Sequence, residues 1–256
     1  MVTIDAADGG RWTSLWLADR EWLWAGPGLL DGPRTGHTAF TDAGGLDECF
    51  PTVRGTPDHG GLWNQPWSES VAYDNTVLTR TFTTGRDTVT VDYQLTAPAG
   101  YRFIWAAHAL LDCAVGATIS AEPSECRLYP EAAQLLGGWP ADAPWVSASW
   151  PALGLDTYGP TDGTAVGAML VDCPRATVRD RDTELTLILS CPGQPVSTAL
   201  WRNLAGVPDG APYRSLGVEP MLGRVFDLAE AGPGDAAVVP ASGELAWRLT
   251  LSARPA

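Results

Sequence analysis

Three residues of the sequence combine side-chain type and setting in a way that suits proton transfer. One histidine, His59, is followed by two glycines; a second, His108, lies inside an apolar run; and a glutamate, Glu219, precedes a proline. Side chains of this kind, held at one site, can act as general base and general acid. Opening a sugar ring needs such a set: a base for the anomeric hydroxyl proton and an acid for the ring oxygen.

Each of these residues also has a plainer interpretation. A loop histidine such as His59 can bond a nearby carbonyl, and His108 can be a hydrogen-bonded core residue, because an imidazole buried without partners is costly. An exposed side chain is the commoner state of a glutamate. Pro220 keeps Glu219 extended and removes a ladder donor. We therefore expect the strand to end or open there, with the carboxylate facing a cleft.

Other reaction classes have weaker support in the sequence. A metal site built from His59, His108 and a carboxylate is an alternative, but the spacings match no metal motif. We find no Gly-x-Ser-x-Gly elbow and no glycine-rich phosphate loop before a helix. The absence of lysine excludes a lysine Schiff base. We assign no role to His37, and we expect neither a cofactor nor a metal.

The elements that must position these residues are predicted to be strands. Residues 87–95 and 184–190 alternate between apolar and polar side chains, which is typical of strands with two unlike faces. Further strands are predicted at 12–17, 21–24, 77–83, 103–111, 165–171 and 245–251, with residues 18–20 as a turn. Frequent glycine and proline leave little room for helices, and the best helical candidate is the short segment 130–136.

Two long segments are predicted to be loops that carry function. Residues 25–65 and 122–163 are rich in turn-forming residues, yet they contain histidines, acids and tryptophans. Long structured loops on a β scaffold are where binding usually resides. Many short strands joined by decorated loops predict an all-β fold, a large β-sandwich. The length of 256 residues fits one domain over 1–256.

Composition narrows the possible partners and the location. Thirty acidic residues outnumber sixteen basic ones, for a net charge of −14, so nucleic acid and anionic membrane surfaces are disfavoured. No segment is apolar enough to span a bilayer, and the first residues do not resemble a signal peptide. Five cysteines without Cys-x-x-Cys pairs indicate reduced thiols in a cytoplasmic protein. Twelve tryptophans suit either sheet packing or stacking on sugars.

Taken in order, these segments resemble the aldose 1-epimerase (galactose mutarotase-like) superfamily over nearly the whole chain. The motifs are individually short, and their order and spacing carry the resemblance. They are Gly9-Gly10 with Trp12-Thr13-Ser14-Leu15, Arg20-Glu21-Trp22-Leu23-Trp24, Asp58-His59-Gly60-Gly61, Trp105-Ala106-Ala107-His108, Trp201-Arg202-Asn203-Leu204 and Gly217-Val218-Glu219-Pro220. The family's fold is a large antiparallel β-supersandwich with its site in a groove on one face.

The resemblance implies an epimerase that interconverts the α and β anomers of a free sugar without a cofactor. Glu219 would take the proton of the C1 hydroxyl, His108 would protonate the ring oxygen, and His59 would help to hold and polarise it. We expect further contacts to a small carbohydrate from a set of acids, tryptophans and one asparagine: Asp47, Glu48, Trp63, Trp67, Trp201 and Asn203. Because Asp47 and Glu48 are adjacent, only one of them should face the site if the segment is extended.

The sequence also departs from the family pattern. The arginine of galactose-type members, found before the first histidine, is replaced by the segment Asp47-Glu48-Cys49-Phe50-Pro51. Ala43 and Trp63 stand where the hexose-6-phosphate branch has arginines, which favours an unphosphorylated sugar; Arg54 alone is weak support for phosphate binding. For the family's additional aspartate, Asp156 and Asp162 are candidates. The alternatives are a non-catalytic carbohydrate-binding protein and a different reaction on a glycoside.

Overall fold

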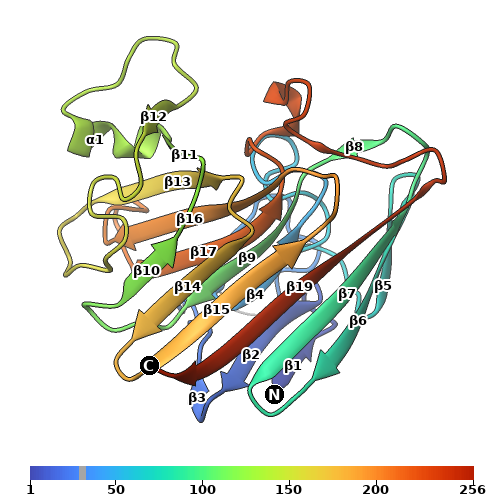
Figure 1. Cartoon of the computed structure of the whole chain (residues 1–256), viewed down its shortest axis with the longest axis horizontal. Helices are drawn as coiled ribbons and strands as arrows, with labels where there is room; N and C mark the ends of the chain where they lie inside the picture. Colours follow the sequence, from blue (N-terminus) through green and yellow to red (C-terminus); the bar gives the residue numbers. More distant parts are fainter. Residues whose placement is uncertain (29–32) are drawn as a thin grey trace.

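Two antiparallel sheets form the protein in the computed structural model, which describes residues 1–28 and 33–256 (Figure 1). Within these residues, the larger sheet has ten strands and the other has seven. The larger sheet runs in the spatial order β1 (Val2–Asp5), β2 (Arg11–Leu17), β4 (Leu46–Cys49), β9 (Trp105–Leu111), β17 (Arg214–Leu222), β16 (Val196–Leu204), β13 (Ala165–Val171), β11 (Glu125–Leu128) and β12 (Val146–Ala148), with β3 (Arg20–Glu21) paired to β2.

The smaller sheet runs in the order β10 (Thr118–Ala121), β14 (Arg175–Asp180), β15 (Thr183–Ser190), β19 (Glu244–Pro255), β7 (Thr88–Thr96), β6 (Thr76–Thr84) and β5 (Ser70–Tyr73). A separate pair is formed by β8 (Arg102–Phe103) and β18 (Ala237–Val238). Helical turns are η1 (Pro130–Ala132), α1 (Ala133–Leu136) and η2 (Leu228–Glu230). The all-β prediction is confirmed. The prediction of one domain over 1–256 stays a prediction.

Most predicted strands are confirmed to within one or two residues. Segments 12–17, 77–83, 87–95, 165–171 and 184–190 correspond to β2, β6, β7, β13 and β15, and β19 extends beyond 245–251 at both ends. The run 103–111 is split at Ile104 into β8 and β9. Residues 21–24 form only the end of β3 and a single bridge at Leu23. Both predicted loops contain short strands, β4 in the first and β11 and β12 in the second.

The strand that carries Glu219 opens on one side but does not end there, so of the two outcomes that we expected the opening is found and the end is not. β17 continues through Pro220 to Leu222 and pairs with β16 along its whole length. On its other side, the pairing with β9 is present at Gly217 and again at Met221 but is interrupted between them. A proline offers no N–H to a ladder, so the chain opens locally on the β9 side and remains paired on the β16 side.

The main core lies between the two sheets, and strand alternation divides each central strand between two faces. In β9, Trp105 and Ala107 point into the main core, whereas His108 points to the opposite face of the sheet. In β17, Val218 faces the main core and Glu219 faces the opposite side. A second, smaller apolar cluster covers part of that opposite face. His108 and Glu219 therefore lie on the face of the ten-stranded sheet that points away from the seven-stranded sheet.

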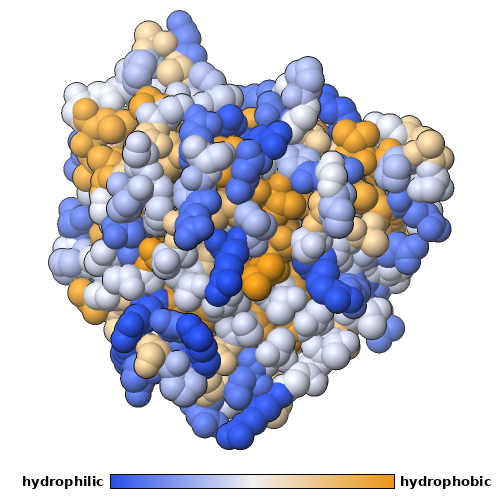
Figure 2. Space-filling view, viewed as in Figure 1, coloured by the Kyte–Doolittle hydropathy of each residue, from blue (hydrophilic) through white to orange (hydrophobic). Residues whose placement is uncertain are grey.

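Figure 2 shows the hydropathy of the molecular surface from the side seen in Figure 1. Hydrophilic and intermediate side chains predominate there, with hydrophobic ones scattered among them. In the described part of the chain, no helix reaches the length and apolarity that a membrane crossing requires. All five cysteines are free thiols.

Candidate active site

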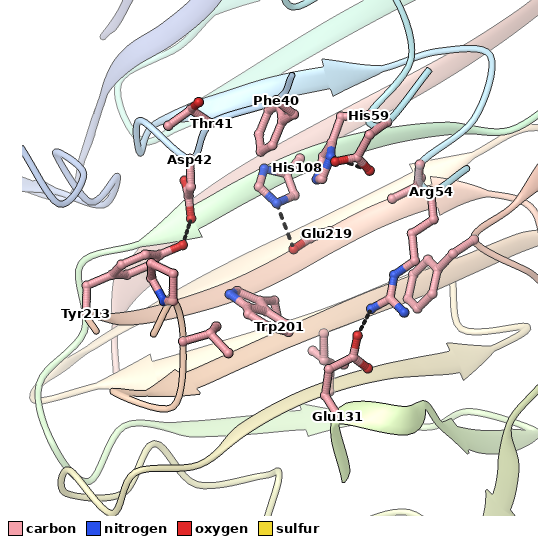
Figure 3. Close-up of a pocket in the computed structure, with 17 residues that line it drawn as sticks. Phe40, Thr41, Asp42, Arg54, His59, His108, Glu131, Trp201, Tyr213 and Glu219 are labelled. Atoms are coloured by element: carbon pink, nitrogen blue, oxygen red, sulfur yellow. Dashed lines mark hydrogen bonds and ion pairs between the residues drawn. The ribbon is translucent and has the colours of Figure 1, made fainter. Parts of the chain in front are cut away.

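A cavity of about 560 Å³ opens on the face of the ten-stranded sheet that points away from the main core (Figure 3). Its volume lies in the range of small-molecule sites. Strands supply the floor, and the loops before β4, between β4 and β5, and before β17 supply the walls. The described lining residues are Phe40, Thr41, Asp42, Val53, Arg54, Asp58, His59, His108, Glu131, Gly167, Leu200, Trp201, Val207, Pro208, Tyr213, Glu219 and Phe226.

Backbone register brings the floor residues together from distant parts of the sequence. Glu219 of β17 is paired with Ala199 of β16, and the next residue on the same face, Gly217, is paired with Trp201. Trp201 is in turn paired with Gly167 of β13. On the other side of β17 lies β9, which carries His108. Hydrogen bonding of four central strands thus fixes the spacing of this floor.

Glu219 is a buried carboxylate with an unused oxygen. Its side chain is 4% exposed, and its Oε1 lies 3.7 Å from Nε2 of His108, which is 9% exposed. Among the described residues, Oε1 has no hydrogen-bond partner. Burial raises the pKa of Glu219 above its ordinary value, while the nearby His108 opposes the shift. A buried oxygen without a hydrogen bond costs folding free energy unless a group in the cavity donates a hydrogen bond to it.

His59, the other histidine of the cavity, is held in place by an aromatic ring. Phe40 stacks on His59 with ring centroids 3.6 Å apart and planes at 11°. The imidazoles of His59 and His108 lie edge to face, 5.0 Å apart, and Asp58 Oδ1 lies 3.2 Å from Nδ1 of His59. His59 itself has a positive φ of 57°, a conformation that the following Gly60 helps to continue. The structure therefore brings together His59, His108 and Glu219, as the motifs led us to expect.

A glycine makes room for the Glu219 carboxylate. A Cβ placed on Gly217 would lie 2.2 Å from Oε1 of Glu219 and 3.0 Å from Cβ of Trp201. Gly217 has no positive φ, so its backbone does not require glycine. Space is the physical reason for the residue: strand positions two apart share a face, and a side chain here would displace the carboxylate.

Polar pairs stand at the two ends of the cavity, with Glu219 and His108 between them (Figure 3). At one end, the hydroxyl of Tyr213 donates to Asp42 Oδ2 at 2.8 Å, and burial followed by the charge of Asp42 raises the pKa of this tyrosine. At the other end, Nη2 of Arg54 lies 2.9 Å from Oε1 of Glu131. The cavity therefore offers acceptors and donors along its length.

The two adjacent acids expected to contact substrate have structural partners instead. Glu48 points toward the seven-stranded sheet, where it accepts from Arg80 at 2.9 Å and from the Tyr93 hydroxyl at 2.6 Å. Asp47 points the other way, and Arg34 binds both of its oxygens, at 2.6 and 3.1 Å. They do face opposite sides, as an extended segment requires, but neither lines the cavity. Their side chains are closed off by buried arginines.

Of the four other expected contacts, one lines the cavity. Trp201 is partly exposed on its floor. Trp63 and Trp67 are buried, and their indole N–H groups donate to backbone carbonyls. Asn203 is buried as well; it bonds the backbone of residues 206 and 207 and so shapes the wall at Val207. These three residues are framework for the site rather than lining.

Several lining residues had no individual signal in the sequence. Phe40 and Asp42 come from the first predicted binding loop, and Glu131 comes from the second, so the loops were identified but not their contributing side chains. Tyr213 follows a Pro-rich turn before β17 and had no signal at all. Asp156 and Asp162, the candidates for an additional aspartate, do not appear among the lining residues. The described residues also contain no group of three or more His, Cys, Asp or Glu side chains that could hold a metal ion.

Comparison with known proteins supports the fold that the motifs suggested. No family model matches the sequence, and no curated protein matches it. Solved structures do match: a proposed aldose 1-epimerase from Escherichia coli K12 aligns with a TM-score of 0.69 at 15% identity, over 100% of this chain and 96% of its own. The chain has the galactose mutarotase-like fold.

Two further structures extend this likeness. A protein of Synechocystis sp. PCC 6803 aligns with a TM-score of 0.69 at 15% identity, covering 100% of this chain and 92% of its own. A galactose mutarotase-like protein from Lactobacillus casei aligns at 0.58 and 15% identity, over 99% and 96% of the two chains. At this identity the galactose mutarotase-like fold is what the likeness shows. The chemistry of the site has to be argued from its own residues.

Proposed function

We propose that this protein is an aldose 1-epimerase-like enzyme that interconverts the α and β anomers of a free sugar. The observation that carries the proposal is the buried Oε1 of Glu219, which lies next to His108 and has no hydrogen-bond partner among the described residues. A sugar hydroxyl placed in the cavity would supply that partner. A carboxylate and an imidazole side by side then provide the base and the acid of one reaction.

Each catalytic group has one proton to move in this mechanism. Glu219 accepts the proton of the C1 hydroxyl while His108, in its protonated form, donates to the ring oxygen, and the C1–O5 bond breaks to give the open-chain aldehyde. After rotation about C1–C2, His108 takes its proton back from the O5 hydroxyl and Glu219 returns its proton to O1. Both groups end in their starting states, so the cycle needs no cofactor and no net proton exchange with water.

The other lining groups hold the sugar during this cycle. His59 lies close enough to His108 to share the ring oxygen or an adjacent hydroxyl. Trp201 offers an indole on the floor, and aromatic faces stack on the C–H faces of sugar rings. Binding energy from these contacts orients the C1 hydroxyl toward Glu219. We further propose a cytoplasmic location, with which the five free thiols agree.

Anomeric exchange measured by NMR tests the proposed reaction. Wild-type protein and Glu219→Gln are compared on a panel of free aldoses, because mutarotation is spontaneous and catalysis appears as an excess rate proportional to protein concentration. We expect acceleration by the wild type and a loss of about 100-fold or more in the variant. Acceleration that survives in Glu219→Gln would refute the role of this residue. Saturable sugar binding without acceleration would favour the alternative, a carbohydrate-binding protein.

A further inference from the structure

One end of the cavity carries an ion pair to which the proposed reaction assigns no role. Arg54 and Glu131 approach to 2.9 Å, and both side chains are about one-third exposed, at 34% and 30%. The guanidinium also lies over the rings of Phe226 and Tyr129, with centroid distances of 4.8 and 5.2 Å. These two rings hold the guanidinium at the cavity wall, so the pair has a defined position in the cavity.

A glycine in the cavity floor makes room for this pair. A Cβ on Gly167 would lie 2.8 Å from Nη2 of Arg54 and 3.2 Å from Oε2 of Glu131. Gly167 has no positive φ and lies inside β13, where a glycine weakens the strand. Backbone conformation therefore does not account for it. The space above Gly167 is filled by the charged ends of Arg54 and Glu131.

The pair has both a donor and an acceptor to offer to a ligand. Glu131 uses Oε1 toward Arg54, while its Oε2 is buried and has no hydrogen-bond partner among the described residues. A guanidinium has more N–H donors than a single carboxylate oxygen can engage. A hydroxyl group, which donates one hydrogen bond and accepts others, complements this arrangement.

Charge at the cavity works against an anionic substituent. The described lining residues include four acids, Asp42, Asp58, Glu131 and Glu219, against one guanidinium and two imidazoles, of which the proposed reaction needs one protonated. That guanidinium is already paired with Glu131. A phosphate or carboxylate placed here would have to compete with Glu131 for Arg54 and would stand beside a like charge.

We propose that the Arg54–Glu131 pair is a specificity subsite that binds a neutral hydroxyl substituent of the sugar and rejects a phosphate or carboxylate at that position. The proposal rests on the proposed function for its sugar ligand. The substrate class is then neutral sugars, and Glu131 prevents Arg54 from binding an anion because it is already paired with the guanidinium.

Binding measurements separate this proposal from the proposed reaction. Calorimetry and ligand-observed NMR measure the affinities for two neutral aldoses, D-glucose and D-galactose, and two anions, glucose 6-phosphate and glucuronic acid. The proteins are wild type, Glu131→Gln and the control Gly159→Ala, whose new Cβ would meet only Leu204 at 3.7 Å. For wild type and control we expect a neutral aldose to bind at least about tenfold more tightly than either anion. In Glu131→Gln, where Arg54 is released, this ratio should fall by about tenfold or more.

The outcomes decide the proposal whether or not the protein is an epimerase. Any one of three results would overturn it. Either anion could bind wild-type protein as tightly as the best neutral aldose, or neither neutral aldose could bind. The third such result is an unchanged ratio of affinities in Glu131→Gln. If wild-type protein shows no anomerase turnover but the ratio of neutral to anionic affinities behaves as expected, only the proposed reaction is refuted.

Gly167→Ala provides a second readout, because it displaces the Arg54–Glu131 pair without altering charge. It should weaken neutral-sugar binding by about tenfold, and wild-type affinity in a variant shown to be folded by its melting curve would contradict the subsite.

Discussion

Strands β4 and β17 both bring carboxylates into the interior, and they surround them in opposite ways. Glu48 accepts hydrogen bonds from a buried arginine and a tyrosine hydroxyl, and Asp47 accepts them from the two terminal guanidinium nitrogens of Arg34. Glu219 has only a histidine at 3.7 Å, and its Oε1 has no hydrogen-bond partner among the described residues. The acids of β4 complete the framework. The acid of β17 keeps an unpartnered oxygen beside a cavity, which is why we propose it as the catalytic base.

Removing the charge should cost much more stability at Glu48 of β4 than at Glu219 of β17. Glu48→Gln leaves Arg80, which is 1% exposed, without its counter-charge, and breaking a buried pair in this way costs about 3–5 kcal/mol. Glu219→Gln removes a buried charge that has no cationic arginine of its own, so the free energy of unfolding should change by less than about 1 kcal/mol. Urea denaturation of the two variants measures both values. Equal destabilisation would break the distinction between framework and functional acids.

Displacing the Glu219 carboxylate without removing it should affect catalysis and spare the framework. In Gly217→Ala the new Cβ would lie 2.2 Å from Oε1, so the carboxylate must turn away from the position that serves the C1 hydroxyl. We expect anomerisation to slow by about 10- to 100-fold, in line with the sensitivity of catalysis to small misplacements. NMR exchange rates check this, with Gly159→Ala as the matched control. A Gly217→Ala rate equal to that of the control would show that the glycine does not position Glu219.

The smallest effect concerns pH. Burial raises the pKa of Glu219 in the folded protein above its ordinary value of 4.5. Folding thus favours the protonated acid, and this stabilisation is complete below the unfolded-state pKa and is lost as pH rises through the folded-state value. The stability of wild type relative to Glu219→Gln should therefore fall as pH rises from below 4.5 toward neutral. The acid limb of the reaction rate should also lie above pH 4.5, and a limb below that value would contradict the shift.

The sequence predicted the parts of the fold that a two-residue period can reveal. β7 and β15 alternate in sequence because one face meets the core and the other meets solvent, and both were found with near-correct bounds. β17 was harder, because eight of its nine residues are buried and Pro220 suggested an end. A strand that lies under the loops of a site on one face and against the core on the other shows no alternation.

The residues that line the cavity could be named from the sequence mainly where a short motif marks each of them. His59, His108 and Glu219, which line one cavity, could be named together because each lies in a short motif of the family that the sequence resembles. The acids of β4 were misread as substrate contacts because the arginines that enclose them, Arg34 and Arg80, are distant in sequence from any motif. Glu131 and Asp42 face the cavity only because their loops fold back over the sheet. The spacing of residues along the sequence does not predict that contact.

The floor of the cavity is fixed by pairing among β9, β17, β16 and β13, whereas its two ends are supplied by loops. This division makes the reaction and the choice of substrate separable engineering targets. Under the proposed function, loop segments around Asp42 and Glu131 can be exchanged between proteins of this fold to change the preferred sugar, while the proposed acid and base stay where the backbone holds them. It also gives evolution a route by which one chemistry could spread over many sugars through changes at the rim alone.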